Sequence, residues 1–116
     1  MSSSRSSILQ GTLDLMVLKT LEHLGPLHGY GIAQRIEQVG QEALIVNQGT
    51  IYLCLTRLVQ KGWIDAEWGR SENNRRAKFY SLTSEGRRQL RAETENWERV
   101  SGVIDRVLAP ATWSGS

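Results

Sequence analysis

The stretch that decides the fold is VNQGTIYLCLTRLVQKGWI, residues 46–64. Its apolar residues recur at spacings of four, three and one, which places them on one side of an α-helix that starts near Gly49. They are Ile51, Leu55, Leu58 and Val59. The opposite side is too polar for a core and too weakly charged for an ordinary solvated surface, and it holds Gly49, Leu53, Thr56, Arg57 and Gln60. A helix with this mixed outer surface is expected to contact a partner.

Two further helices are predicted upstream. From Thr12 onward apolar residues recur at helical spacing, and they cover so much of the helix that we expect it to pack on two sides. The stretch GPLHGYG, residues 25–31, is interpreted as a turn, because a phosphate-binding loop would follow a strand and end in Lys-Ser or Lys-Thr. A second helix is predicted from about Tyr30 to Val39, ending at Gly40. Its inward residues are expected to be Ile32, Ala33, Ile36 and Val39.

A β-hairpin is predicted directly behind the third helix. WIDAEWG, residues 63–69, and AKFYSL, residues 77–82, both alternate in the manner of strands, and the polar segment GRSENNRR joins them. Three helices followed by two strands is the order of a winged helix-turn-helix. The fold class is therefore expected to be mainly α with a small β-hairpin.

The hairpin is unusually basic. Residues 69–78 hold one acidic residue, Glu72, against four basic ones: Arg70, Arg75, Arg76 and Lys78. Such a tip can simply be solvated, but we favour contact with a phosphate backbone or a minor groove, where each neutralised phosphate releases counterions. Asn73 and Asn74 suit both the turn and hydrogen bonding.

A long last helix is predicted from LTSEGRRQL, residues 82–90, to about Leu108. Thr83 or Ser84 is the expected cap. Leu90, Trp97 and Ile104 lie seven residues apart, as do Val100 and Val107, which gives a narrow heptad-like stripe. The stripe can pack on its own domain or on a second chain, and we favour the second chain.

The whole chain predicts one compact domain with an appended helix. It has 116 residues and a formal net charge of +2. The single cysteine, Cys54, is interpreted as a small buried hydrophobe and fits a reducing compartment. MSSSRSS is not a secretory signal and no apolar stretch reaches the ~20 residues of a membrane helix, so a cytoplasmic protein is expected. The expected divisions are a disordered N-terminus over 1–7, a DNA-binding domain over 8–82, a dimerisation helix over 83–108 and a loose tail over 109–116.

Catalytic chemistry has no support in the sequence. His23 and His28 are five residues apart across a Gly-Pro break, which is not metal-ligand spacing, and no second cysteine supports a zinc site. Nucleophile and dinucleotide-binding motifs are missing. We expect neither enzymatic activity, metal nor cofactor, and we expect His28 to act as a neutral hydrogen-bonding group before its helix.

Three segments resemble the PadR family of bacterial transcriptional regulators, especially short members of an acidobacterial type. They are QGTLDLMVLKTLEHLGPLHGYGIAQRIE, QGTIYLCLTRLVQKGWI and SENNRRAKFYSLTSEGRRQL, which occur in order between residue 8 and about residue 91. The resemblance implies a homodimer, usually a repressor, whose third helix enters the major groove of a palindromic operator while its wing touches the flanking minor groove. It also implies dimerisation through the last helix with help from the first, and in some members a response to phenolic or flat aromatic compounds.

Carried onto this chain, the resemblance places Thr50 and Tyr52 at the backbone-contacting start of the recognition helix and Tyr30 at the start of the second helix. Trp97 takes the place of a tryptophan that lines a pore between chains in certain relatives; it is either an effector contact or an ordinary interface anchor. Leu53 departs from the family, where a proline usually follows the tyrosine. We interpret that proline as belonging to the first helical turn, and Leu53 either meets a thymine methyl or is a neutral variation.

These observations predict a DNA-binding regulator. Thr50 and Tyr52 are expected to bind phosphate, and Thr56, Arg57 and Gln60 to read base edges. The full predicted DNA-binding set is Tyr30, Gln48, Thr50, Tyr52, Thr56, Arg57, Gln60, Asn74, Arg75, Arg76 and Lys78. The predicted dimer interface is Leu13, Met16, Val17, Leu90, Trp97, Val100, Ile104 and Val107. The competing hypotheses are a winged-helix protein-interaction module and a dimeric small-molecule sensor that does not read DNA.

Overall fold

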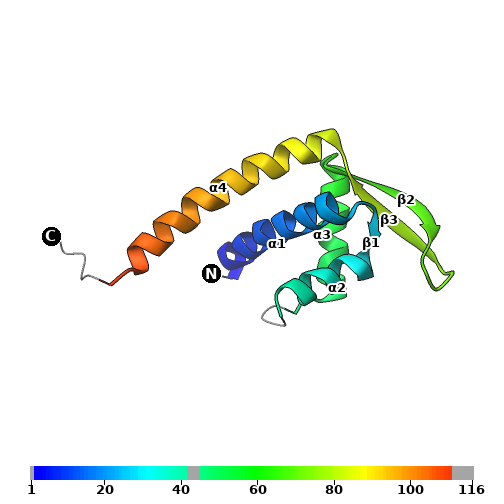
Figure 1. The fold of residues 1–116 in the computed structure, drawn as a ribbon, viewed down its shortest axis with the longest axis horizontal. Helices are drawn as coiled ribbons and strands as arrows, with labels where there is room; N and C mark the ends of the chain where they lie inside the picture. Colours follow the sequence, from blue (N-terminus) through cyan, green and yellow to red (C-terminus); the bar gives the residue numbers. More distant parts are fainter. Residues whose placement is uncertain (1, 42–44, 111–116) are drawn as a thin grey trace.

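The structure, a computed structural model, describes residues 2–41 and 45–110, with side chains from residue 11 onward. The elements in chain order are α1 (Ser2–Leu24), β1 (Leu27–His28), α2 (Gly29–Val39), α3 (Gln48–Gln60), β2 (Ile64–Arg70), β3 (Arg76–Leu82) and α4 (Ser84–Leu108). This order confirms the predicted winged helix-turn-helix with a long C-terminal helix. The molecule is elongated, 62 × 30 × 29 Å, because the β2–β3 hairpin projects from one end and α4 runs to the other (Figure 1).

One core holds α1, α2, α3 and the sheet together. Each helix contributes its regularly spaced apolar side, and Ile64 and Tyr80 close the core from the sheet. The fully buried side chains include Val17, Leu18, Leu21, Ile32, Ile51, Leu55 and Leu58. Cys54 is buried among them, as the sequence predicted. Two expected core residues are instead exposed: Val39, at the last turn of α2, and Val59, at the edge of the buried side of α3.

The N-terminal region differs from its prediction. Helix α1 begins at Ser2, ten residues before the expected start at Thr12, so residues 2–7 are helical rather than disordered. The segment has neither proline nor glycine before Gly11, and once a packed helix exists each added residue gains a hydrogen bond. The C-terminal residues 111–116 of the expected tail lie outside the described residues.

The sheet has three strands in the order β1-β3-β2, all antiparallel, where the sequence predicted two. Leu27 and His28, expected to lie in a turn, pair with Tyr80 and Phe79. Two residues are too few for a periodicity to be visible in the sequence. His28 also caps α2 as expected, because its Nδ1 accepts a hydrogen bond from the Gly31 amide at 3.0 Å, which requires an unprotonated Nδ1.

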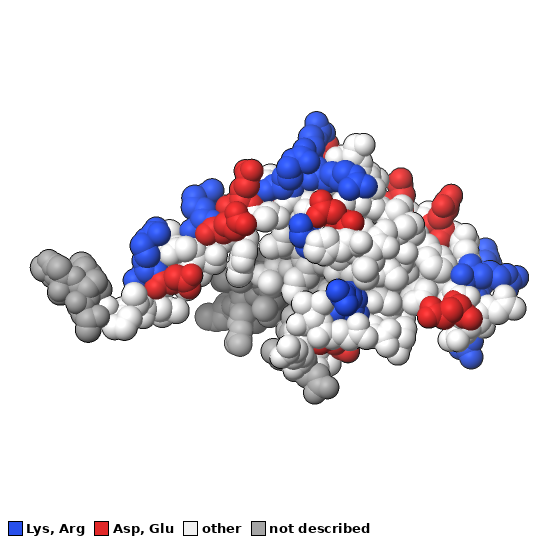
Figure 2. Space-filling view, in the orientation of Figure 1, with Lys and Arg blue, Asp and Glu red and all other residues white. Residues whose placement is uncertain are grey.

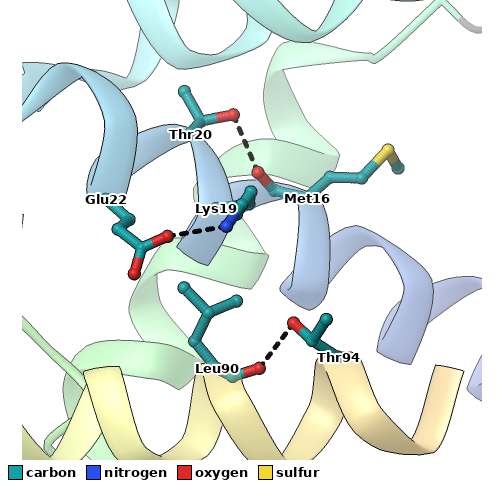
Figure 3. A network of polar contacts seen from close by, with 6 residues as sticks. All are labelled: Met16, Lys19, Thr20, Glu22, Leu90 and Thr94. Atoms are coloured by element: carbon teal, nitrogen blue, oxygen red, sulfur yellow. Dashed lines mark hydrogen bonds and ion pairs between the residues drawn. The ribbon is translucent and has the colours of Figure 1, made fainter. Parts of the chain in front are cut away.

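The start of α4 is fixed by Thr83. Its Oγ1 accepts a hydrogen bond from the Gly86 amide and donates one to the Gly62 carbonyl. Helix α4 then runs beside α1, where the hydroxyls of Thr20 and Thr94 each bond to a carbonyl of the preceding turn in their own helix (Figure 3). Leu90 is buried at this contact. The first half of α4 therefore belongs to the winged helix domain and only its second half projects.

Candidate nucleic-acid interface

The N-terminus of α3 is held by Asn47. Its Oδ1 accepts hydrogen bonds from the amides of Gly49 and Thr50 at 2.7 and 3.2 Å, so the cap satisfies two of the helix's free donors. With Ile51, Leu55 and Leu58 buried, the helix turns its other side to solvent. The exposed residues of that side are Gln48, Gly49, Thr50, Tyr52, Leu53, Thr56 and Gln60. The mixed outer surface that the sequence indicated is thus accessible.

Arg57 does not belong to this accessible surface in the way that we predicted. Its Nη2 donates to Asp14 Oδ1 on α1 at 2.5 Å, and the Cys54 thiol donates to the same oxygen at 3.0 Å. The Arg57 and Asp14 side chains are only 25% and 12% exposed. A guanidinium that is paired with a carboxylate has fewer donors for a base edge, so Arg57 is less suited to reading bases than the sequence suggested.

A groove of about 1000 Å³ opens between α2, α3 and the hairpin. It brings together six of the predicted DNA-binding residues: Tyr30, Gln48, Tyr52, Arg75, Arg76 and Lys78. Thr50, Thr56, Arg57, Gln60 and Asn74 do not line it. Tyr30 and Tyr52 are each more than half exposed and stand at the helix starts on either side. The groove therefore combines two tyrosine hydroxyls with cations from a different part of the chain.

The hairpin, which we call the wing (residues 64–82), is shaped by a tight turn. The Asn74 amide donates to the Ser71 carbonyl and the Ser71 amide to the Arg75 carbonyl, at 2.8 and 2.9 Å. Asn74 has φ of 60°, a conformation that asparagine tolerates better than most residues. Asn74 thus serves the turn, and the turn holds Arg75 beside the first residue of β3.

Trp68 organises the cations of the wing. Arg76 lies over its ring at 4.3 Å and Lys78 at 5.4 Å, measured to the ring centroid. The register of the sheet explains this, because Trp68 pairs with Lys78 and all three side chains lie on one surface of the hairpin. Each cation is attracted by the ring quadrupole, which restricts two otherwise mobile chains to the groove side. Figure 2 shows basic side chains gathered at the end of the molecule where Figure 1 places the wing.

Apart from Tyr30, sequence reasoning missed the residues that α2 contributes to this groove, and it missed Trp68. Gln34, Arg35 and Gln38 line it beside Tyr30. Tyr30, Gln34 and Gln38 are spaced by four, so the polar side of α2 was visible in the sequence as an i, i+4 series. Trp68 shares one face of the sheet with Ile64 and Ala66 but is 57% exposed, because the hairpin extends beyond the core there.

The predicted dimer residues divide into two groups. Leu13, Val17 and Leu90 are buried in the core of the chain itself, so they are not available to a partner. Met16 is half-buried against the same core. The remaining four, on the projecting half of α4, are exposed, and so are two residues beside them. This group, the α4 apolar patch, consists of Trp97, Val100, Val103, Ile104, Val107 and Leu108.

No helix among the described residues is long and apolar enough to cross a membrane. Within the same residues, histidine, cysteine and acidic side chains form no cluster that could hold a metal ion.

Comparison with known proteins gives one family. The profile of the transcriptional regulator PadR-like family matches residues 17–92. A protein from Lysinibacillus sphaericus, called protein X, is 30% identical over 101 residues, which is 87% of this chain and 92% of that protein. Among solved structures, a transcriptional regulator from Clostridium thermocellum superimposes with a TM-score of 0.79 at 27% identity, covering 89% of this chain and 99% of the other. A PadR family transcription regulator from Clostridium difficile superimposes with a TM-score of 0.70 at 30% identity, covering 83% of this chain and 97% of the other.

Proposed function

Because the chain belongs to the PadR-like family of transcriptional regulators, which are not enzymes, we propose that this DNA-binding regulator works as a homodimeric repressor on a palindromic operator. Each chain places the outer side of α3 in a major groove and its wing along the neighbouring backbone. The observation that carries the proposal is the groove in which Tyr30 and Tyr52 face the wing cations Arg76 and Lys78.

We assign a different task to each group of residues in and beside the groove. Arg75, Arg76 and Lys78 neutralise phosphates, which fixes the position of the chain and makes binding depend on salt. Tyr30, Tyr52 and Gln48 donate uncharged hydrogen bonds to the same backbone strand, and Arg35 adds a fourth cation from α2. Thr50 contributes a phosphate contact from the other edge of α3. Thr56 and Gln60 then lie over the base edges.

Binding to duplex DNA is the direct test. A labelled duplex from upstream of the chain's own coding sequence is titrated in excess random-sequence competitor, and fluorescence anisotropy reports the bound fraction. We expect tight binding that persists in competitor and weakens steeply with salt. A protein-interaction module, or a sensor that does not read DNA, would show only weak association that the competitor removes.

The α4 apolar patch supports dimerisation. Its six large apolar side chains are 40–75% exposed in the single chain. Exposing this much apolar surface to water is unfavourable, because burying it would release free energy in proportion to its area. A second α4 of a two-fold partner covers the patch with the same residues. Two paired chains hold their α3 helices about 34 Å apart, one turn of DNA.

The dimer is tested by sedimentation. Wild-type protein is expected to sediment as a dimer at micromolar concentration, and Ile104→Glu as a monomer, because a carboxylate buried in the patch has no partner. Arg91→Glu, an exposed position on the other side of α4, is the matched control and should remain dimeric. A wild-type monomer would remove the dimer from the proposal.

We place effector sensing at Trp97. This residue is 48% exposed within the α4 apolar patch, so pairing of two patches brings two indole rings to one interface. A planar aromatic compound held there relieves repression only if it binds better to a dimer with a different spacing of the α3 helices. Such compounds are expected to quench tryptophan fluorescence in the wild type but much less in Trp97→Phe, and to release the duplex. Equal quenching in both proteins would exclude Trp97 as the contact.

A further inference from the structure

Leu53 is a large apolar residue whose side chain is exposed to solvent. It is 65% exposed, although it lies in the middle of a helix whose other side is completely buried. It is the sixth residue of α3, since the helix begins at Gln48. Its amide therefore lies within the helical hydrogen-bond ladder, and our first-turn interpretation of the proline in relatives does not apply here. In place of a proline ring, this position carries an accessible aliphatic side chain at the outer surface of α3.

The direction in which Leu53 points follows from helix geometry. Successive residues turn by about 100°, and the buried residues of α3 fix which direction is inward. The residues that point most directly outward are Gly49, Leu53, Thr56 and Gln60, at spacings of four, three and four. All four are exposed and none is charged. Arg57 stands beside them but is bound to Asp14.

We propose that Leu53 is a specificity-determining residue that contacts the C5-methyl group of a thymine in each half of the operator. In a major groove, an apolar side chain distinguishes thymine through that methyl, whereas guanine is read chiefly by a free Arg or Lys. The outward surface of α3 offers Leu53 but no free cation. The inference rests on the proposed function, because it requires that α3 lies in a major groove.

The neighbours of Leu53 fit this placement. Gly49, one turn earlier, has no side chain, so the helix can approach the bases closely at that point. The Thr56 hydroxyl donates to the Tyr52 carbonyl at 2.9 Å, which leaves it an acceptor for the amino group of adenine or cytosine. Tyr52 lies on the wing side of Leu53 and lines the groove. A DNA strand whose backbone lies in that groove therefore brings its adjoining bases into contact with Leu53.

The test removes each partner of the contact in turn. A binding site is selected from a randomised duplex library with the wild-type protein, and every thymine in it is then replaced singly by deoxyuridine, which lacks only the methyl. Affinities are measured by anisotropy for the wild type and Leu53→Ala. Val39→Ala is the matched control, because Val39 is also 65% exposed but lies at the end of α2.

At one thymine per half-site, deoxyuridine should weaken the wild type and Val39→Ala about fourfold, the value of one buried methyl group. Leu53→Ala should bind the two duplexes equally. Leu53→Met, which restores an apolar reach, should recover the methyl dependence. If Leu53→Ala binds no site, Leu53→Gln, which keeps the length of the side chain but ends in a polar group, replaces it in the comparison.

Two results would overturn the inference: deoxyuridine has no effect at any position, or its effect is the same with and without the Leu53 side chain. Both leave the proposed function intact, since a site was still selected. Failure to select any site would instead contradict the proposed function itself.

Discussion

Arg57 of α3 is bound to Asp14 of α1, 43 residues earlier in the chain, through a 2.5 Å contact between Nη2 and Oδ1. Cys54 donates to the same carboxylate oxygen, so one carboxylate on α1 holds two successive turns of α3. No buried side-chain nitrogen or oxygen among the described residues lacks a hydrogen-bond partner. The pair links α3 to α1 on the side next to the buried residues of α3, so it supports the orientation that the core gives to this helix.

Replacing Asp14 with Ala is expected to destabilise the fold. Removing one partner of a fully buried pair costs about 3–5 kcal/mol, and we expect about 2–3 kcal/mol because Arg57 keeps some contact with water. The free energy of unfolding in urea measures the loss. Glu22→Ala is the control, since its ion pair with Lys19 is exposed and should contribute less than about 1 kcal/mol. Equal losses in the two variants would mean that the Asp14 pair contributes no more to the stability of the fold than an exposed ion pair.

The wing is expected to set the salt dependence of binding. Arg75→Ala combined with Arg76→Ala should weaken duplex binding. It should also make the negative slope of log K against log salt shallower, by about 0.9 for each phosphate that the wing no longer neutralises. Arg88→Ala combined with Arg91→Ala removes the same charge from α4, away from the groove, and should leave the slope nearly unchanged. Anisotropy titrations at several salt concentrations give both slopes. If both double variants lower the slope equally, net charge rather than the wing determines binding.

Gly86 packs the first turn of α4 against the segment between α3 and β2. A Cβ at this position would lie 2.0 Å from the Trp63 carbonyl oxygen and 2.9 Å from Leu82 Cδ1, and the backbone cannot move aside without disturbing the Thr83 cap. Gly86→Ala should therefore cost about 3 kcal/mol or more in unfolding free energy. On the same helix, Gly102→Ala meets only a flexible arginine terminus at 3.9 Å and should stabilise by about 0.5–1 kcal/mol. A stable Gly86→Ala protein would show that this junction relaxes.

The buried thiol of Cys54 is expected to make the free energy of unfolding fall as the pH becomes alkaline. Burial raises the pKa of Cys54 far above its ordinary range, and the hydrogen bond to the Asp14 carboxylate raises it further. A raised pKa in the folded state gives stability that is complete below the ordinary value of about 8.5 and declines as pH rises above it. Between pH 8.5 and 10 we expect unfolding free energy to fall by up to about 1.4 kcal/mol per pH unit relative to Cys54→Ala. Parallel pH profiles for the two proteins would contradict this.

Much of the fold could be predicted from the sequence because its signals are local. The apolar spacing of Ile51, Leu55 and Leu58, the alternation around Ala66 and Tyr80, and the cap before Gly86 each depend on a few neighbouring residues. The structure places all of these elements as expected. The two-residue strand β1 and the early start of α1 carried no comparable signal, since tertiary pairing and helix propagation produced them.

The site was less predictable because exposure and pairing are tertiary properties. Nothing local distinguishes Arg57, which pairs with a distant carboxylate, from Arg76, which remains in the groove. Helix periodicity also could not tell that Leu13 and Val17 pack within the chain whereas Trp97 and Ile104 are exposed, because both helices present an apolar side. Charge clustering in the wing, by contrast, was visible in ten consecutive residues.

Selection from a randomised duplex library tests most directly whether two paired chains set α3 and the wing on one stretch of DNA. We expect the enriched sequences to share an inverted repeat whose half-sites are centred about 10 base pairs apart, one turn of the double helix. Enrichment of a single unrepeated motif, or of no motif at all, would contradict the account.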